Sequence, residues 1–153
     1  VRRVGVRSAA VLRSEGDVRR AARARVQGDA LDLPLRLSGF SRIQVAQLFS
    51  EADLLLMTSQ SEGSPQAVKE AMACNLSIVS TPVGDVKELL QGVRDCYVSE
   101  THCAEELAAL AVRSLKKNGV GMTGSEKVIS MKLDAHSIAD EIYKIYSNMT
   151  DYR

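Results

Sequence analysis

The sequence predicts an α/β domain, built as a Rossmann-like parallel sheet with helices on both faces. Short apolar runs alternate with stretches of helical periodicity along the 153 residues, which is the pattern of repeated strand–helix units. The run 53–57 is short and, after Asp53, wholly apolar, as expected for a central strand covered on both faces. After a polar loop, Ser64-Pro65 marks a helix start, because serine caps helices and proline fits the first helical position.

The segment before the central strand contains two strand–helix pairs. The turn at 14–17 ends in Asp17, which can cap the helix that follows, and Gly39 ends the second strand. The expected elements are a strand over Ala9–Leu12, a helix over about 18–26, a strand over Leu35–Ser38 and a helix over Ile43–Ser50.

The segment after the central strand continues the alternation. The helix Pro65–Ala73 should end near Asn75, which tolerates the left-handed turn at a helix end. Asp85 and Glu88 form a capping-box pattern that opens the next helix. Further elements are a strand over Ser77–Ser80, a strand over Cys96–Ser99, and helices over about 104–116 and 134–149. The last helix should pack back on the body, because its apolar residues Ile138, Ile142, Ile145 and Tyr146 form one stripe.

Length and composition indicate one ordinary globular domain. Apolar residues make up 45% and charged residues 25% of the chain, and no apolar run approaches the length of a membrane span. We therefore expect a cytoplasmic protein. The three cysteines, Cys74, Cys96 and Cys103, lack metal-ligand spacing and are expected to be buried free thiols, so no metal site is predicted.

Charge is distributed unevenly along the chain. Residues 1–50 hold ten Arg, no Lys and four acidic residues, a net +6, and the rest of the chain carries a net −5. A basic front end can contact phosphate, nucleic acid or an anionic membrane surface, and a solvated helix face is the plainer alternative. Because aromatic residues make up only 4% of the chain, base stacking is disfavoured and no nucleic-acid partner is expected. Peripheral membrane contact stays open.

The loop between Thr58 and Pro65 is the expected ligand site. Ligands of open parallel sheets bind beyond the carboxyl ends of the strands, and this loop leaves a central strand at that edge. The helix after it should present the N–H groups of Gln66, Ala67 and Val68 to an anion, most naturally a phosphate. Glu62 and Glu70 bracket this position and could accept hydrogen bonds from sugar hydroxyls. The alternative is that Glu62 is a solvated loop residue and Glu70 pairs with a basic side chain.

The run LLLMTSQSEGSPQAVKEAMACNLSIVSTPVGDVKEL resembles the donor-domain core of glycosyltransferase family 4, which uses the GT-B fold. A weaker similarity extends from about Val11 to Tyr146, where LRLSGF resembles the segment that faces the nucleotide base and DAHSIADEIYKIY resembles the usual final helix. The matching residues are Glu62, Gly63, Pro65, Glu70, Ala71, Met72, Ala73, Thr81, Val83, Gly84 and Glu88.

The resemblance implies a role for each part of this core. Glu62 would be the catalytic-site residue in contact with the transferred sugar, and Glu70 would hold the ribose hydroxyls. The sugar and phosphates would be lined, largely through backbone, by Gly63, Ser64, Pro65, Gln66 and Ala67. The base would meet Gly39, Phe40 and Ser41. Thr81 and Gly84 would shape the floor of the site, and turn or cap chemistry is an equal alternative for these two.

By the same resemblance, the chain is one half of a GT-B fold that binds a nucleoside-diphosphate sugar for retaining transfer, without a metal or other cofactor. We expect a single donor-binding domain over 1–153, with a poorly matched segment at 1–10 and the core at 11–149. Arg7 and Arg13 cannot be assigned to the family's diphosphate-binding Arg and Lys.

The family's acceptor-binding domain has no counterpart in this sequence. A sugar or lipid-linked acceptor would therefore be reached only through a missing N-terminal domain, and the chain alone should be inactive. The alternatives are a non-catalytic nucleotide-binding module and an interaction domain that self-associates through an uncovered sheet edge.

Overall fold

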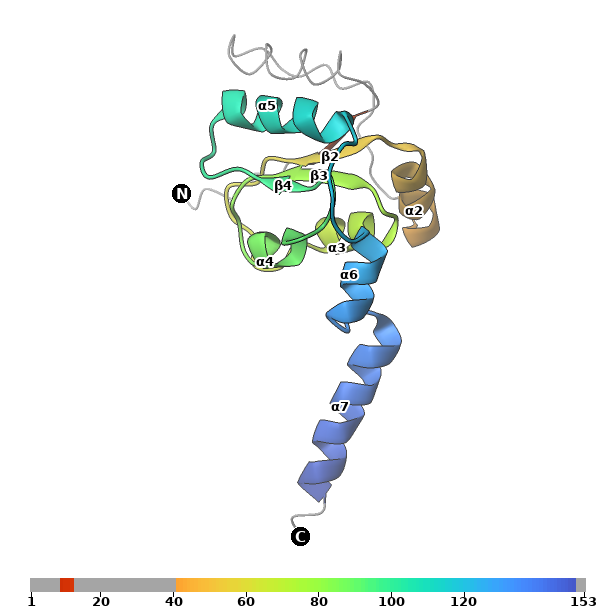
Figure 1. Ribbon diagram of the computed structural model, residues 1–153. Helices are drawn as coiled ribbons and strands as arrows, with labels where there is room; N and C mark the ends of the chain where they lie inside the picture. Colours follow the sequence, from red (N-terminus) through yellow and green to blue (C-terminus); the bar gives the residue numbers. More distant parts are fainter. Residues whose placement is uncertain (1–8, 13–40, 151–153) are drawn as a thin grey trace.

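The computed structural model describes residues 9–12 and 41–150, which form a small sheet covered by helices (Figure 1). The strand order is β1 (Ala9–Leu12), β2 (Leu54–Met57), β3 (Ser77–Ser80) and β4 (Tyr97–Val98). The predicted helix at 18–26 and strand at 35–38 lie outside the described residues.

The sheet is parallel from β2 to β4. Leu54 pairs with Ser77 in β3, and Val79 pairs with Tyr97 in β4, both in parallel register. The predicted parallel sheet is thus confirmed for these three strands, but β1 runs antiparallel to β2, with Ala9 opposite Met57. Because the side-chain alternation of a strand has the same period in either direction, the sequence pattern does not encode this choice.

Helices cover both faces of the sheet, as predicted. In Figure 1, α5 (Ala104–Leu115) lies on one side, and α3 (Gln66–Ala73) and α4 (Val86–Leu90) lie on the other. Successive residues of β2 point to opposite faces, so Leu55 packs with the α3 and α4 core while Leu54 packs with Leu107 of α5. All four β2 residues are buried, which explains why this run is apolar throughout.

Helix α2 (Arg42–Glu51) confirms the predicted helix at 43–50. It begins with a full capping box, in which the Gln44 backbone N–H donates to the Ser41 hydroxyl and the Gln44 side chain accepts from the Ser41 N–H. Phe49 is the buried anchor of this helix, and it joins the same core as α3.

Helix α3 begins differently from the prediction and ends as predicted. Pro65 occupies the N-cap position, and no side chain caps the helix, so the predicted Ser64 cap is wrong. At the other end, Asn75 adopts a positive φ of 56°, and the N–H groups of Asn75 and Leu76 donate to the Met72 and Ala71 carbonyls. This is a Schellman motif, which satisfies the last carbonyls of the helix.

Helix α6 (Gly124–Ser130) was not predicted from the sequence. It begins with a capping box between Thr123 and Glu126. Gly124 packs so closely on α3 that an added Cβ would overlap the Met72 carbonyl oxygen. The Asn75 side-chain oxygen also accepts from the Ser125 N–H at 2.9 Å. The C-terminal end of α3 is therefore tied to α6, which explains why a glycine begins the helix.

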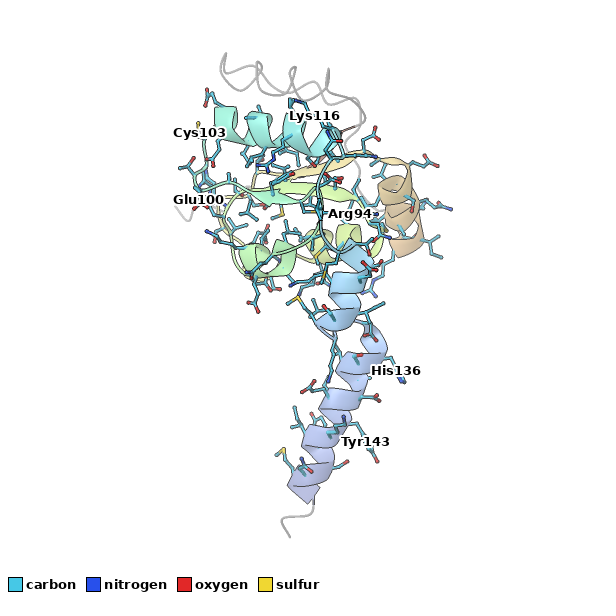
Figure 2. All side chains as sticks on the ribbon, in the orientation of Figure 1. Arg94, Glu100, Cys103, Lys116, His136 and Tyr143 are labelled. Carbon is cyan, nitrogen blue, oxygen red and sulfur yellow. The ribbon has the colours of Figure 1, made fainter. Side chains whose placement is uncertain are left out.

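Helix α7 (Ala135–Thr150) projects away from the body in Figure 1. The prediction that it packs back is wrong: Ile138, Ile142 and Ile145 are 44%, 49% and 57% exposed. Figure 2 shows His136 and Tyr143 on this helix, well clear of the sheet. An apolar stripe indicates that a helix face suits burial, but it does not say against what.

The cysteines divide three ways. Cys96 is buried, Cys74 is half-buried and Cys103 is exposed, so the expectation of buried thiols is right only for Cys96. Among residues 9–12 and 41–150, no helix is long and apolar enough to cross a membrane.

Candidate functional site

The loop at 58–65 leaves the carboxyl end of β2 and leads into α3, at the sheet edge where the sequence predicts a site. Gly63, Ser64 and Gln66 are exposed, while Pro65 is buried beneath them. The tip of the helix is therefore open to solvent.

The amides at the start of α3 are partly free. The Val68 N–H donates to the Pro65 carbonyl at 3.2 Å, so the prediction of three free amides is wrong for Val68. Within the described part of the chain, the N–H groups of Gln66 and Ala67 have no acceptor. Together with the helix dipole, these two amides favour an anionic ligand.

Glu62 is held by Ser59, which is itself held by Thr81. The Ser59 hydroxyl donates to Glu62 Oε1 at 3.1 Å, and the Thr81 hydroxyl donates to the Ser59 carbonyl at 2.6 Å. Thr81 also donates its N–H to the Met57 carbonyl at 3.1 Å. Ser59 and Thr81 are 2% and 1% exposed. The orientation of the Glu62 carboxylate is thus fixed from the ends of two neighbouring strands, β2 and β3.

Gly63 is held on one side by the turn that precedes α4. Gly84 has a φ of 51°, and an added Cβ there would overlap the Gly63 carbonyl oxygen. The Asp85 N–H donates to that same carbonyl at 3.2 Å. In contrast, a Cβ built on Gly63 itself meets no atom within 4 Å. The loop therefore has a closed side toward α4 and an open side beside Gly63.

Asp85 contributes its side chain to the same contact. The Ser64 hydroxyl donates to Asp85 Oδ2, while Asp85 Oδ1 is buried with no hydrogen-bond partner within the described part of the chain. Asp85 does occupy the N-cap position of α4, but its carboxylate makes no cap bond, so the predicted capping box with Glu88 is wrong. The carboxylate accepts from Ser64, which is distant in sequence, and not from the first amides of α4.

Glu70 lies on the outer face of α3. It is one helical turn from Gln66, and the buried residues of the helix, Val68, Ala71 and Met72, lie on the other side. Its side chain is partly buried, and it makes no ion pair with another described residue. The spacing places Glu70 on the same face of α3 as the free amides.

The structure thus joins most of the predicted site residues in one loop-and-helix unit. Thr81 and Gly84 contact the backbone of that loop, at Ser59 and Gly63, and Thr81 is buried. Their contacts therefore stabilise the loop. Ser41 is engaged in the α2 cap, and Gly39, Phe40, Arg7 and Arg13 lie outside the described residues. The members of the loop-and-helix unit are Glu62, Gly63, Ser64, Pro65, Gln66, Ala67 and Glu70.

Two residues of this region were missed from the sequence: Ser59 as the partner of Glu62, and Asp85 as the partner of Ser64. The three-residue spacing from Ser59 to Glu62 suits a local hydrogen bond and could have been noticed. No sequence signal connects Ser64 to Asp85, because they are 21 residues apart.

Outside the site loop, the surroundings shift the pKa of several groups. Burial raises the pKa of the Cys96 thiol to about 12. The Thr101 hydroxyl lowers the pKa of Glu106, and the Thr123 N–H lowers that of Glu126, and both carboxylates belong to surface turns or caps. Among residues 9–12 and 41–150, no group of three or more His, Cys, Asp or Glu side chains could hold a metal ion.

Comparison with known proteins identifies the family of the chain. The family described as Glycosyl transferases group 1 matches residues 5–117, more than half of the chain. The chain belongs to this family. The resemblance to the glycosyltransferases that the loop-and-helix motif predicted is thereby confirmed.

Curated glycosyltransferase relatives share about a quarter to a third of their residues with the matched part of the chain. The phosphatidylinositol N-acetylglucosaminyltransferase GPI3 subunit of Saccharomyces cerevisiae is 25% identical over 70% of this chain and 24% of its own length. The D-inositol 3-phosphate glycosyltransferase of Mycobacteroides abscessus is 26% identical over 74% of this chain and 26% of its own. The N-acetyl-alpha-D-glucosaminyl L-malate synthase of Bacillus anthracis is 33% identical over 47% of this chain and 19% of its own.

A solved structure supports the fold. The sucrose-phosphate synthase of Thermosynechococcus elongatus superposes with a TM-score of 0.68 at 21% identity, covering 92% of this chain and 36% of that protein. The predicted fold class, one half of a GT-B glycosyltransferase, is confirmed. The chain spans about a quarter or less of the curated relatives it matches.

Proposed function

We propose that this chain is the donor-binding domain of a glycosyltransferase and holds a nucleoside-diphosphate sugar at the start of α3. The observation that carries the proposal is the open helix tip: the free N–H groups of Gln66 and Ala67 lie between a carboxylate in the preceding loop and another one turn along the helix. Two amides and the helix dipole suit a diphosphate, and flanking carboxylates suit the hydroxyls of attached rings.

The two carboxylates have different proposed partners. Glu62 belongs to the loop, where the buried Ser59 hydroxyl orients it, and it would accept hydrogen bonds from the transferred sugar. Glu70 lies behind the amides on α3 and would hold the ribose. No described residue lies within 4 Å of a Cβ built on Gly63, which leaves room for a ligand to approach the backbone.

The proposed transfer proceeds with retention and without a metal. The amides and dipole of α3 would stabilise the diphosphate leaving group, and basic side chains outside the described residues would add to this. The acceptor would be a sugar or a lipid-linked molecule bound by another domain. The three relatives carry different acceptors in their names, whereas two of the names contain N-acetylglucosamine, which makes that sugar the first donor to test.

Calorimetric titration of the 153-residue chain tests the proposal. The titrants are uridine, guanosine and adenosine diphosphates, each alone and as its glucose or N-acetylglucosamine conjugate. We expect one nucleotide series to bind at millimolar affinity or better. If no member of any series binds, the sugar-nucleotide function is wrong.

Two substitutions then separate the proposed roles. Glu70→Ala should weaken binding of the free nucleoside diphosphate by about 1–3 kcal/mol, because it removes a charged acceptor of ribose hydroxyls. Glu62→Ala should leave the free diphosphate unaffected and weaken the sugar conjugate. Glu141→Ala, on the exposed part of α7, is the control and should change neither affinity. Unchanged affinity for the conjugate in both variants would contradict the assignment.

A turnover assay distinguishes the alternative function. The chain is combined with the acceptor domain of a relative, and release of the nucleoside diphosphate is followed. Binding without any release in every combination would favour a non-catalytic nucleotide-binding module.

A further inference from the structure

The contact between the site loop and the turn before α4 is an unusual use of a carboxylate. Asp85 stands at the N-cap position of α4, where its side chain could accept from the first-turn amides of that helix. Instead one oxygen accepts from Ser64, 21 residues earlier, and the other is buried without a partner among the described residues. A residue at a helix N-cap position that makes no cap bond departs from the usual pattern, and such departures are expected at functional sites.

This contact holds the second half of the loop, after Glu62. The Asp85 N–H and the Gly84 backbone hold the Gly63 carbonyl, and the Asp85 carboxylate holds the next residue, Ser64. Opposite, a Cβ on Gly63 would meet no atom within 4 Å. Ser64 itself is exposed and caps no helix. Without the Asp85 side chain, the described structure holds the exposed Ser64 by no other side-chain bond.

We propose that Asp85 is a positioning residue of the sugar-binding loop: through Ser64, its carboxylate fixes the backbone from Gly63 to Gln66 in the arrangement that receives the sugar diphosphate. The inference rests on the proposed donor-binding function for its ligand. The effect of Asp85 on the loop does not depend on a ligand, so it is tested first in the chain without ligand.

Amide hydrogen exchange of the ligand-free 153-residue chain tests that effect. The reporter is the amide of residue 85, which donates to the Gly63 carbonyl at 3.2 Å; its rate is called loop exchange below. Ser64→Ala and Asp85→Ala should each raise loop exchange by about fivefold, the factor that corresponds to losing one net hydrogen bond of about 1 kcal/mol. The double variant should exchange no faster than either single variant, because both remove the same bond. Asp85→Asn should retain nearly wild-type exchange, since its amide oxygen can still accept from Ser64.

A matched control is available on the same helix. Lys87 is an exposed residue of α4 that pairs with Glu100 at 3.3 Å, and Lys87→Ala should leave loop exchange unchanged. A merely structural role of Asp85 would raise exchange throughout α3 and α4 by the same factor as loop exchange. Such a uniform rise would overturn the inference. So would unchanged loop exchange in both alanine variants, and so would additive effects in the double variant.

The ligand arm follows with the nucleotide series that the wild-type chain binds. Asp85→Ala should weaken the sugar conjugate by about fivefold and the free diphosphate by less than about twofold, because Ser64, the residue that Asp85 holds directly, precedes the free amides on the side of Glu62, where the sugar is proposed to bind. Equal weakening of both ligands would overturn the positioning role. If the wild-type chain binds no nucleotide, the proposed function fails, whereas the exchange data still decide whether Asp85 fixes the loop.

Discussion

At the scale of single residues, the two glycines of the site have opposite surroundings. Gly84 has a positive φ and lies directly against the Gly63 carbonyl, so its lack of a side chain is required by the protein itself. Gly63 does not have a positive φ, and a Cβ added to it would have no neighbour within 4 Å. No described residue occupies the space that a side chain at position 63 would enter, so we expect a side chain there to interfere with a bound ligand and not with the fold.

Gly63→Ala tests this reasoning. We expect the melting temperature to stay within about 2 °C of the wild-type value, because the methyl group enters open space and surface changes of this kind alter stability by about 0.5 kcal/mol or less. Affinity for the sugar conjugate should fall at least about tenfold, because the methyl group occupies the approach to the backbone. Differential scanning fluorimetry and calorimetric titration measure the two effects, and unimpaired binding would show that the space is not part of the site.

The Cys96 thiol gives a pH-dependent prediction. Burial raises its pKa to about 12 from an ordinary value of 9.0, so the thiol stays protonated in the folded chain while the unfolded chain ionises. The contribution is complete below pH 9 and is lost as the pH rises toward 12. Within that window this group alone lowers the free energy of unfolding by up to about 1.4 kcal/mol per pH unit.

Urea titrations from about pH 8 to about pH 10.5, a range that spans the ordinary thiol pKa, check this value against Cys96→Ala. The variant should show a shallower fall of stability with pH, whatever its absolute stability. Parallel slopes would mean that Cys96 is not the titrating group. Thiol labelling at about pH 8 gives a second readout, since exposed Cys103 should react and buried Cys96 should not.

At the scale of elements, the start of a helix was harder to predict than its end. The Schellman turn at Asn75 depends on a residue that tolerates a left-handed conformation, which is a local property of the sequence. The starts of α3 and α4 are not capped by Ser64 and Asp85, because the Ser64 hydroxyl donates to the Asp85 carboxylate instead. Both side chains suit a cap, but they bond to each other, and the sequence does not show that they meet.

Asn75 offers a test of how that helix end is stabilised. Asn75→Ala should lower the free energy of unfolding by about 1–3 kcal/mol, because alanine tolerates the positive φ poorly and the bond to the Ser125 N–H is lost. Asn75→Gly keeps the backbone conformation and should lose less, by about 1 kcal/mol. Urea denaturation of the three proteins measures the order, and a glycine variant less stable than the alanine variant would contradict it.

In the sheet, too, features that depend on local sequence were predicted, and features that depend on contacts between distant segments were not. The range of β3 was predicted from the sequence, that of β2 was predicted to within one residue, and the apolar composition of β2 predicted that both its faces are covered. The antiparallel direction of β1 and the presence of α6 did not follow. Both depend on which segments meet in space, as in the contact of Gly124 with the Met72 backbone.

At the scale of the whole molecule, α7 stands apart from the body that its sequence was expected to join. Tyr143 and Met149 are 74% and 67% exposed, and the stripe of isoleucines is also open. The described body has its core between the sheet and α3, α4 and α5, and no α7 residue belongs to that core.

Removal of residues 135–153 is therefore expected to leave the body folded. The melting temperature should change by less than about 4 °C, since little apolar area is lost from the packed core and a change of about 1 kcal/mol moves a domain of this size by that amount. Far-ultraviolet circular dichroism should lose the signal of one helix. Light scattering should show less association, because an exposed apolar stripe promotes it. Global unfolding of the shortened chain would show that α7 contributes to the core.

The hydrogen bonds from Thr81 to the Ser59 backbone and from Ser59 to Glu62 have a consequence for protein engineering. These bonds connect the site loop to the ends of β2 and β3. Gln60 and Ser61, which lie between Ser59 and Glu62, are exposed. Randomising these two positions should therefore diversify donor preference at little expense to folding, whereas libraries that include residues 59 or 81 would mix altered selectivity with misplaced loops.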